Sequence, residues 1–143
     1  MDRTQNKTPD KESTKREEAE DPKTVIWRPE NLRAEIKKKW PVDVRENVGF
    51  QLQRVQFGKE PNNYRTMPSI GAGVYEIKVQ DDDKKQFRLI YVAKFAEAIY
   101  VIHVITGKTT ERTSPQDIEL AKQRLKQIIE ERKAEKKKSK DDE

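Results

Sequence analysis

The chain has 143 residues, of which 40% are charged and only 32% are hydrophobic, so it can bury one modest core and is expected to form one domain. It has no cysteine and a single histidine, which excludes disulfides, thiolate metal sites and metal sites built from several histidines. No run approaches the roughly 20 apolar residues of a membrane helix, and the start lacks the apolar segment of a signal peptide, so we expect a cytoplasmic protein that does not enter the membrane.

The net charge of +5 is spread unevenly along the chain. Residues 1–22 carry a net charge of −2, residues 23–130 carry +6, and residues 131–143 carry +1. Residues 1–22 contain one large apolar side chain and are predicted to be a disordered tail. Residues 23–130 are the predicted folded domain, and residues 131–143 a charged extension of its last helix. A compact basic domain attracts phosphate backbones, which makes nucleic acid the leading class of partner, with acidic proteins as the alternative.

The first half of the domain is predicted to hold one strand and two helices. Thr24–Trp27 is a short apolar run typical of a strand. The four-residue spacing of Leu32, Ile36 and Trp40 predicts a short helix that Pro41 ends. A second helix is expected to begin at Asp43 with a capping box to Glu46, and to stop at Gly58.

The second half is predicted to hold three strands and a helix. The strands are expected near residues 74–79, 87–95 and 99–105, joined as an antiparallel meander. In the first strand Glu76 and Lys78 alternate with apolar residues, so one face is expected to pack and the other to stay wet. Ser114 followed by Pro115 predicts the start of the last helix. The fold class is therefore α+β, with two N-terminal helices and a C-terminal helix packed on a small, mainly antiparallel sheet.

Basic residues interrupt the apolar pattern of these strands and of the loop that follows them. They are Lys78, Arg88 and Lys94 on the strands and Lys108 and Arg112 beyond them. RNA can be cleaved without a metal if a ribose hydroxyl loses its proton, the charge on the phosphate is neutralised and the leaving oxygen is protonated. Arginine and lysine can neutralise the phosphate directly, so a patch of these residues would suit such a reaction.

Motifs spread over most of the chain outside its tails point to a known family. They are Val44-Arg45 and Gly49-Phe50-Gln51-Leu52; Pro61 with Tyr64-Arg65-Thr66-Met67; the segments 70–78 and 87–95; Tyr100-Val101-Ile102-His103; and Lys108, Arg112-Thr113, Asp117-Ile118 and Ala121. In this order and spacing, the sequence resembles the RelE/HigB superfamily of toxins from type II toxin–antitoxin systems, and in particular its phage-derived HigB-like branch.

The resemblance implies a RelE-like fold and an mRNA interferase that needs no metal or cofactor. Such a toxin enters the decoding site of the ribosome and promotes attack of a ribose hydroxyl on the next phosphate, which leaves a cyclic phosphate. By position, Arg88, Lys78 and Lys108 would be the catalytic residues. The residues expected to contact RNA are Arg112, Lys94 and Arg65, and the hydroxyl of Tyr91 is a secondary candidate.

The sequence departs from the family pattern at two positions that bear on catalysis. Thr109 stands where relatives of this branch commonly have a second lysine after Lys108, and Glu76 stands where some RelE proteins carry a catalytic lysine. The carboxyl-terminal histidine that some HigB toxins use is also absent. His103, the one histidine, lies between Ile102 and Val104 and is expected to be a hydrogen-bonded core residue.

Each basic residue also has a structural interpretation, because lysines and arginines on a sheet are usually solvated or paired. For Lys94 we expect a structural role, and Lys78 could pair with an acidic neighbour. Two other functions remain open at this point: a ParE-like toxin that poisons DNA gyrase, and a basic nucleic-acid-binding module without catalysis.

The resemblance also implies partners. A toxin of this type acts on mRNA at the ribosome and is held inactive by a cognate helix-turn-helix antitoxin of the HigA/XRE kind. The antitoxin is expected to cover the basic surface of the toxin.

Overall fold

A computed structural model describes residues 21–110 and 112–141 of the chain. The predicted disordered tail, residues 1–22, falls almost entirely outside the described residues. Eight elements follow one another in the order β1, α2, α3, β2, β3, β4, β5 and α4. Their bounds are Thr24–Trp27 for β1, Asn31–Lys39 for α2, Val42–Gln56 for α3, Tyr64–Thr66 for β2, Val74–Gln80 for β3, Gln86–Val92 for β4, Ala98–Lys108 for β5 and Pro115–Asp141 for α4.

The two N-terminal helices form where the apolar spacing predicted them. Leu32 and Ile36 are the buried residues of α2, and Trp40, just after it, is also buried. The helix α3 ends as predicted before Gly58, whose φ of +80° is the left-handed conformation that glycine adopts most easily. The predicted capping box at Asp43 is wrong: α3 begins one residue earlier, at Val42, directly after Pro41. No side chain caps this helix, because proline has no side-chain acceptor.

The strands form one five-stranded sheet in the order β1-β5-β4-β3-β2. The predicted meander is confirmed, since β3, β4 and β5 pair antiparallel in sequence order. At one edge β1 pairs parallel with β5, with Thr24 opposite Ala98. At the other edge the short strand β2, which the sequence did not predict, pairs antiparallel with β3 and places Arg65 opposite Glu76.

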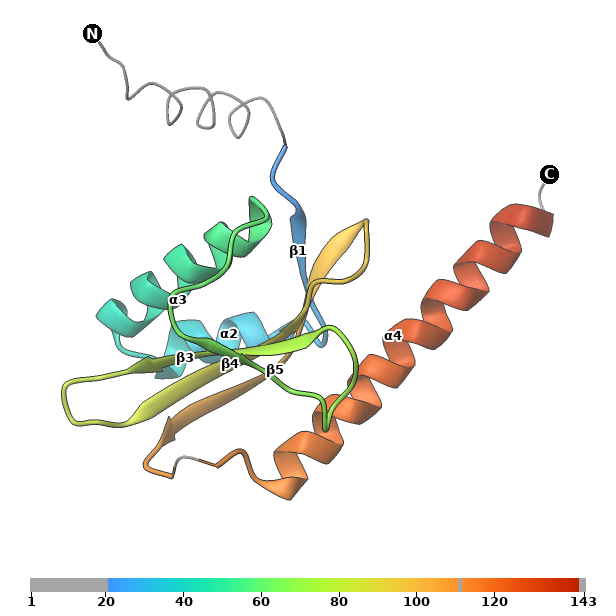
Figure 1. Cartoon of the computed structure of the whole chain (residues 1–143). Helices are drawn as coiled ribbons and strands as arrows, with labels where there is room; N and C mark the ends of the chain where they lie inside the picture. The colour runs from blue at the N-terminus through green and yellow to red at the C-terminus, as the bar shows by residue number, and fades with distance from the viewer. Residues whose placement is uncertain (1–20, 111, 142–143) are drawn as a thin grey trace, which may run out of the picture.

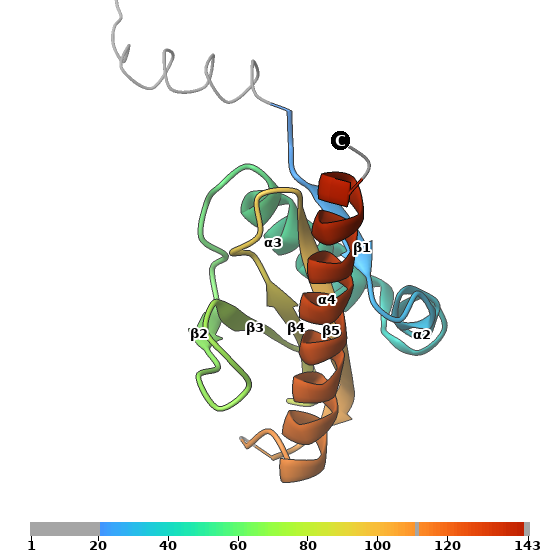
Figure 2. The same ribbon diagram turned by 90° about the vertical axis from the view of Figure 1, so that its right-hand side faces the viewer.

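Helices cover both faces of the sheet, which makes the molecule three layers deep (Figure 1). The face that carries Ile77, Leu89 and Val101 packs against α2 and α3. The opposite face, which carries Ile90, Val92 and Ile102, packs against α4. Figure 2 shows α4 running across this second face. Because α4 packs on this second face, the expectation that the face stays exposed to solvent is wrong at Glu76, which is completely buried, whereas Lys78 on the same face is half-buried.

The last helix covers only part of its face of the sheet. Ser114 caps it as predicted, since its hydroxyl oxygen accepts a hydrogen bond of 3.1 Å from the amide of Asp117. The side that packs on the sheet carries Ala121, Leu125 and Ile128. Beyond these residues α4 runs past the sheet edge, where its side chains from 133 to 138 are exposed (Figure 1). The predicted α+β class, with two helices before the sheet and one after it, is confirmed.

Candidate functional site

Polar and basic side chains gather at one end of the sheet face that α4 leaves partly uncovered. Strand alternation brings Glu76 and Lys78 of β3 to this face together with Gln86 and Arg88 of β4. Lys78 lies directly opposite Arg88 in the antiparallel pair. Gln86 lies opposite Lys108, the last residue of β5. Three of the predicted site residues, Lys78, Arg88 and Lys108, are therefore close neighbours.

A buried carboxylate lies at the centre of this group. Glu76 is completely buried, and its Oε1 accepts a hydrogen bond of 2.8 Å from Nε of Arg65. Its Oε2 accepts one of 2.8 Å from the hydroxyl of Thr113, which lies just before α4. A second nitrogen of Arg65 also donates to the Thr113 hydroxyl, over 3.1 Å. The three residues thus tie β2, β3 and the start of α4 together.

Arg88 lies beneath this network and is also completely buried. Its guanidinium donates to Gln86 Oε1, to the carbonyl of Thr110 and, over 3.4 Å, to the hydroxyl of Thr113. Among the described residues its Nε has no hydrogen-bond partner. Arg88 therefore supports the segment before α4 from below and does not reach the surface in this conformation.

The cations that do reach the surface lie around this buried network. Arg65, Lys108 and Arg112 are exposed, and Lys78 is half-buried. They come from β2, from β3 and from the end of β5 with the loop after it, three segments that are separate in the sequence. The structure brings these predicted residues to one end of the sheet, where the side chains of Arg65, Lys108 and Arg112 are exposed.

Lys94 does not belong to this group. It follows the end of β4, six residues from Arg88, which corresponds to about 20 Å along an extended chain. The stem of Lys94 packs against Gly73, where an added Cβ would lie 2.8 Å from its Cδ, and its ammonium lies 5.3 Å from the centre of the Phe95 ring. These contacts fit the structural role.

Tyr91 lies on the opposite face of the sheet from Arg88. Its ring is buried and stacks on Tyr75 with the ring centres 5.6 Å apart. Burial, and to a smaller extent the charge of the neighbouring groups, raises the pKa of its hydroxyl. Tyr91 is therefore separated by the sheet from the cations that it was predicted to assist.

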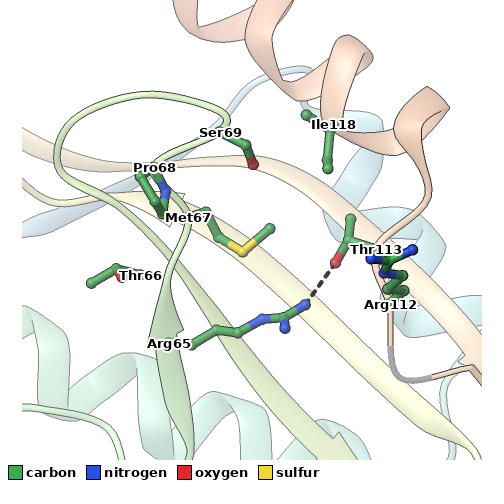
Figure 3. A pocket seen from close by; sticks show the side chains of 8 residues that line it. All are labelled: Arg65, Thr66, Met67, Pro68, Ser69, Arg112, Thr113 and Ile118. Atoms are coloured by element: carbon green, nitrogen blue, oxygen red, sulfur yellow. Dashed lines mark hydrogen bonds between the residues drawn. The ribbon is translucent and has the colours of Figure 1, made fainter.

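An open pocket of about 230 Å³ adjoins the cations, between the β2–β3 connection and the start of α4 (Figure 3). Its lining residues are Arg65, Thr66, Met67, Pro68, Ser69, Arg112, Thr113 and Ile118. Arg65 reaches across it to Thr113, and Arg112 lies beside Thr113 (Figure 3). The sequence did not predict this pocket, because it forms only where β2 pairs with β3 and α4 docks on the sheet.

The histidine lies in a second polar network that anchors the first turns of α4. His103 is buried on β5, and its Nδ1 lies 2.9 Å from Nη1 of Arg124. Because a guanidinium can only donate, Nδ1 must accept and the imidazole is neutral with its proton on Nε2. That proton is donated to Asp117 Oδ1 over 2.7 Å. His103 is a hydrogen-bonded core residue, as predicted, and it fixes the position of the helix start beside the site.

The described part of the chain holds neither a cluster of metal ligands nor a membrane-spanning helix. Within residues 21–110 and 112–141, no three His, Cys, Asp or Glu side chains come together in a way that could hold a metal ion. No helix in these ranges is long and apolar enough to cross a bilayer.

Comparison with known families identifies the class of protein. Residues 35–126, more than half of the chain, match the family described as phage derived protein Gp49-like (DUF891). The chain therefore belongs to the Gp49-like family, which is a family of HigB-like toxins in the RelE/ParE superfamily. The α+β architecture is consistent with the RelE-like fold of that superfamily. Searches of the curated proteins and of the solved structures found no match.

The buried carboxylate gives the first prediction. Glu76→Gln keeps the shape of the side chain but removes the charge that holds Arg65 and Thr113, so the free energy of unfolding should fall by about 1–3 kcal/mol. Urea denaturation at neutral pH measures this change. The exposed Glu119→Gln on α4 is the matched control and should stay within about 0.5 kcal/mol of wild type. Equal stability of the two variants would contradict a structural role for the buried charge.

Asp117 gives a prediction about pH. Burial raises the pKa of Asp117, but the hydrogen bonds from His103 and Ser114 outweigh it and hold the pKa below its usual value. A lowered pKa in the folded state means that the carboxylate stabilises the fold above its unfolded pKa of about 3.9, and that this contribution is lost as the pH falls through the lower folded value.

Asp117→Asn should therefore lower the free energy of unfolding at pH 7 by about 1–2 kcal/mol, and the difference from wild type should shrink below about pH 4. Urea denaturation between pH 7 and pH 3 measures the difference, with the exposed Asp82→Asn as the control. A difference that stays constant over this range would show that the ionised carboxylate does not contribute.

Proposed function

We propose that this protein is the toxin of a type II toxin–antitoxin system and cleaves translated mRNA at the ribosome. The observation that carries the proposal is the convergence of Arg65, Lys78, Lys108 and Arg112 at one end of an open sheet face, in a chain that belongs to a family of HigB-like toxins. Such a group of cations favours a phosphate backbone as the ligand.

The chemistry needs charge neutralisation more than any other contribution. The proposed reaction is attack of a ribose 2′-hydroxyl on the adjacent phosphate, with departure of the 5′-oxygen of the next nucleotide. It yields a 2′,3′-cyclic phosphate and a 5′-hydroxyl and requires no metal or cofactor. Lys78 is proposed to neutralise the charge that develops on the phosphate, because it lies directly opposite Arg88 and on the same face of β3 as Glu76. Arg65, Lys108 and Arg112 would hold the phosphates on either side.

Arg88 receives a different role from the one that the family resemblance implied. Its burial and its bonds to Gln86, Thr110 and Thr113 support a positioning role beneath the exposed cations. It would fix the segment that carries Thr113 and Arg112, and add its own positive charge to the site. In this role Arg88 affects the reaction without touching the RNA.

The proposal also names partners and a place of action. The targets would be mRNA and the ribosome, in the cytoplasm where messages are translated. Toxin families of this kind imply a cognate antitoxin, and we propose that a helix-turn-helix protein covers the exposed cations and blocks access to RNA. Opposite charge would favour an acidic segment of that antitoxin at this surface.

Induction in a bacterial host tests the function. Wild type should arrest growth and produce new ends within translated messages. The double variant Lys78→Ala/Arg112→Ala should lower the frequency of cuts about 10- to 1,000-fold, since Lys78 would stabilise charge in the transition state and Arg112 would hold a neighbouring phosphate in place. The control is Lys126→Ala/Lys133→Ala, which removes two exposed cations of α4 and should arrest growth like wild type.

Growth and mapped transcript ends together distinguish the alternatives. Arrest without new RNA ends would contradict the interferase and would point to gyrase as the target. No arrest by a folded wild type would leave a nucleic-acid-binding module without catalysis.

A further inference from the structure

The pocket beside the cations has two kinds of wall. Met67, Pro68 and Ile118 give it apolar surface, and Met67 is only 5% exposed. Arg65 and Arg112 give it guanidinium groups. Its volume of about 230 Å³ is smaller than the roughly 300–1,000 Å³ of pockets for whole drug-sized ligands. It therefore suits a small, flat and partly apolar group that is attached to an anion.

Arg65 is held in a fixed orientation at this pocket. Its Nε donates to Glu76 over 2.8 Å and a terminal nitrogen donates to Thr113 over 3.1 Å, so two partners on different segments define the plane of the guanidinium. Half of its side chain remains exposed, at 48%. Arginine planes of this kind stack on unpaired bases in RNA complexes, and a guanidinium that is already ordered loses little entropy when it does so.

A hydroxyl group completes the lining. Ser69 lies on the β2–β3 connection, and Figure 3 shows Ser69 and Ile118 on opposite sides of the pocket, above Met67, whereas the side chain of Thr66, the last residue of β2, points away from them. Hydroxyls can donate or accept, so they can pair with the polar edge of a base. An isolated anion would use the guanidinium groups but gain nothing from the apolar wall.

We propose that this pocket binds one unstacked base of single-stranded RNA, with Arg65 as the stacking surface and Arg112 at the phosphate of the same nucleotide. The inference rests on the proposed function and extends it, because it assigns the place where the nucleotide next to the reacting phosphate is held. Selectivity for RNA sequence would then arise at Ser69 and Ile118, which line the pocket on either side of Met67.

The test is an NMR titration of the full chain with the four nucleoside monophosphates, with ribose 5-phosphate and inorganic phosphate as probes that lack a base. Nucleotides should shift the resonances of Met67, Ser69 and Ile118, and at least one nucleotide should bind roughly fivefold to 100-fold more tightly than ribose 5-phosphate, as expected for one base stack. Equal affinity for ribose 5-phosphate, or shifts that map elsewhere, would overturn the proposal.

A variant of Arg65 separates stacking from charge, and a variant of Ser69 tests whether the pocket must be open. Arg65→Lys keeps the charge but loses the plane, and should remove the preference for nucleotides over ribose 5-phosphate while phosphate still binds. Arg33→Lys, on the exposed side of α2, is the matched control and should bind like wild type. Ser69→Trp fills the pocket from an exposed position and leaves every side chain of the Glu76 network in place, and should abolish nucleotide binding with an unchanged melting temperature. Retained binding by Ser69→Trp would overturn the proposal.

The failure of this inference and the failure of the proposed function give different results. If wild type cuts mRNA and Ser69→Trp cuts the same sites equally well, the pocket proposal is wrong and the toxin proposal stands. If nucleotides bind in the pocket but wild type neither arrests growth nor cuts RNA, the pocket proposal stands and the interferase is wrong.

Discussion

The site depends on one buried interaction, the bridge from the Glu76 carboxylate to Arg65 and Thr113. A completely buried carboxylate is costly unless it is paired and hydrogen-bonded, so the fold must supply both partners at once. Arg65 comes from the edge strand β2 and Thr113 from the segment before α4, and each can reach Glu76 only when its own element has docked. The same interaction orients Arg65 at the pocket, and Arg88 donates a further hydrogen bond to the Thr113 hydroxyl from below. The position of the sheet edge, the docking of α4 and the geometry of the site thus depend on the same contacts.

The elements that the sequence predicted correctly are those with local signals. The four-residue spacing in α2 and α3, the apolar strands and the Ser114 cap depend on neighbours in the chain. The strand β2 has only three residues and exists because β3 lies beside it, so no local pattern marks it. The cap at Asp43 was wrong because the helix already begins at Val42, directly after Pro41. Glu76 was expected in solvent because alternation within β3 identifies its face but not what covers that face.

The same distinction applies to the site. Four of the cations that the family resemblance predicted for the site lie together at one end of the sheet. They are Arg65, Lys78, Lys108 and Arg112. The resemblance identified Arg88 without indicating its burial, which changes its proposed role from contact to support. Glu76, Thr113 and the pocket depend on contacts between segments up to 48 residues apart, which spacing cannot reveal.

The chemistry of the RNA ends tests the central proposal most directly. A defined message is translated in a reconstituted bacterial system with the purified chain, and the ends of every fragment are identified. The proposed mechanism predicts cuts confined to translated codons, with a 2′,3′-cyclic phosphate on the upstream fragment and a 5′-hydroxyl on the downstream one. An intact message, or fragments that end in a 3′-hydroxyl and a 5′-phosphate, would contradict it.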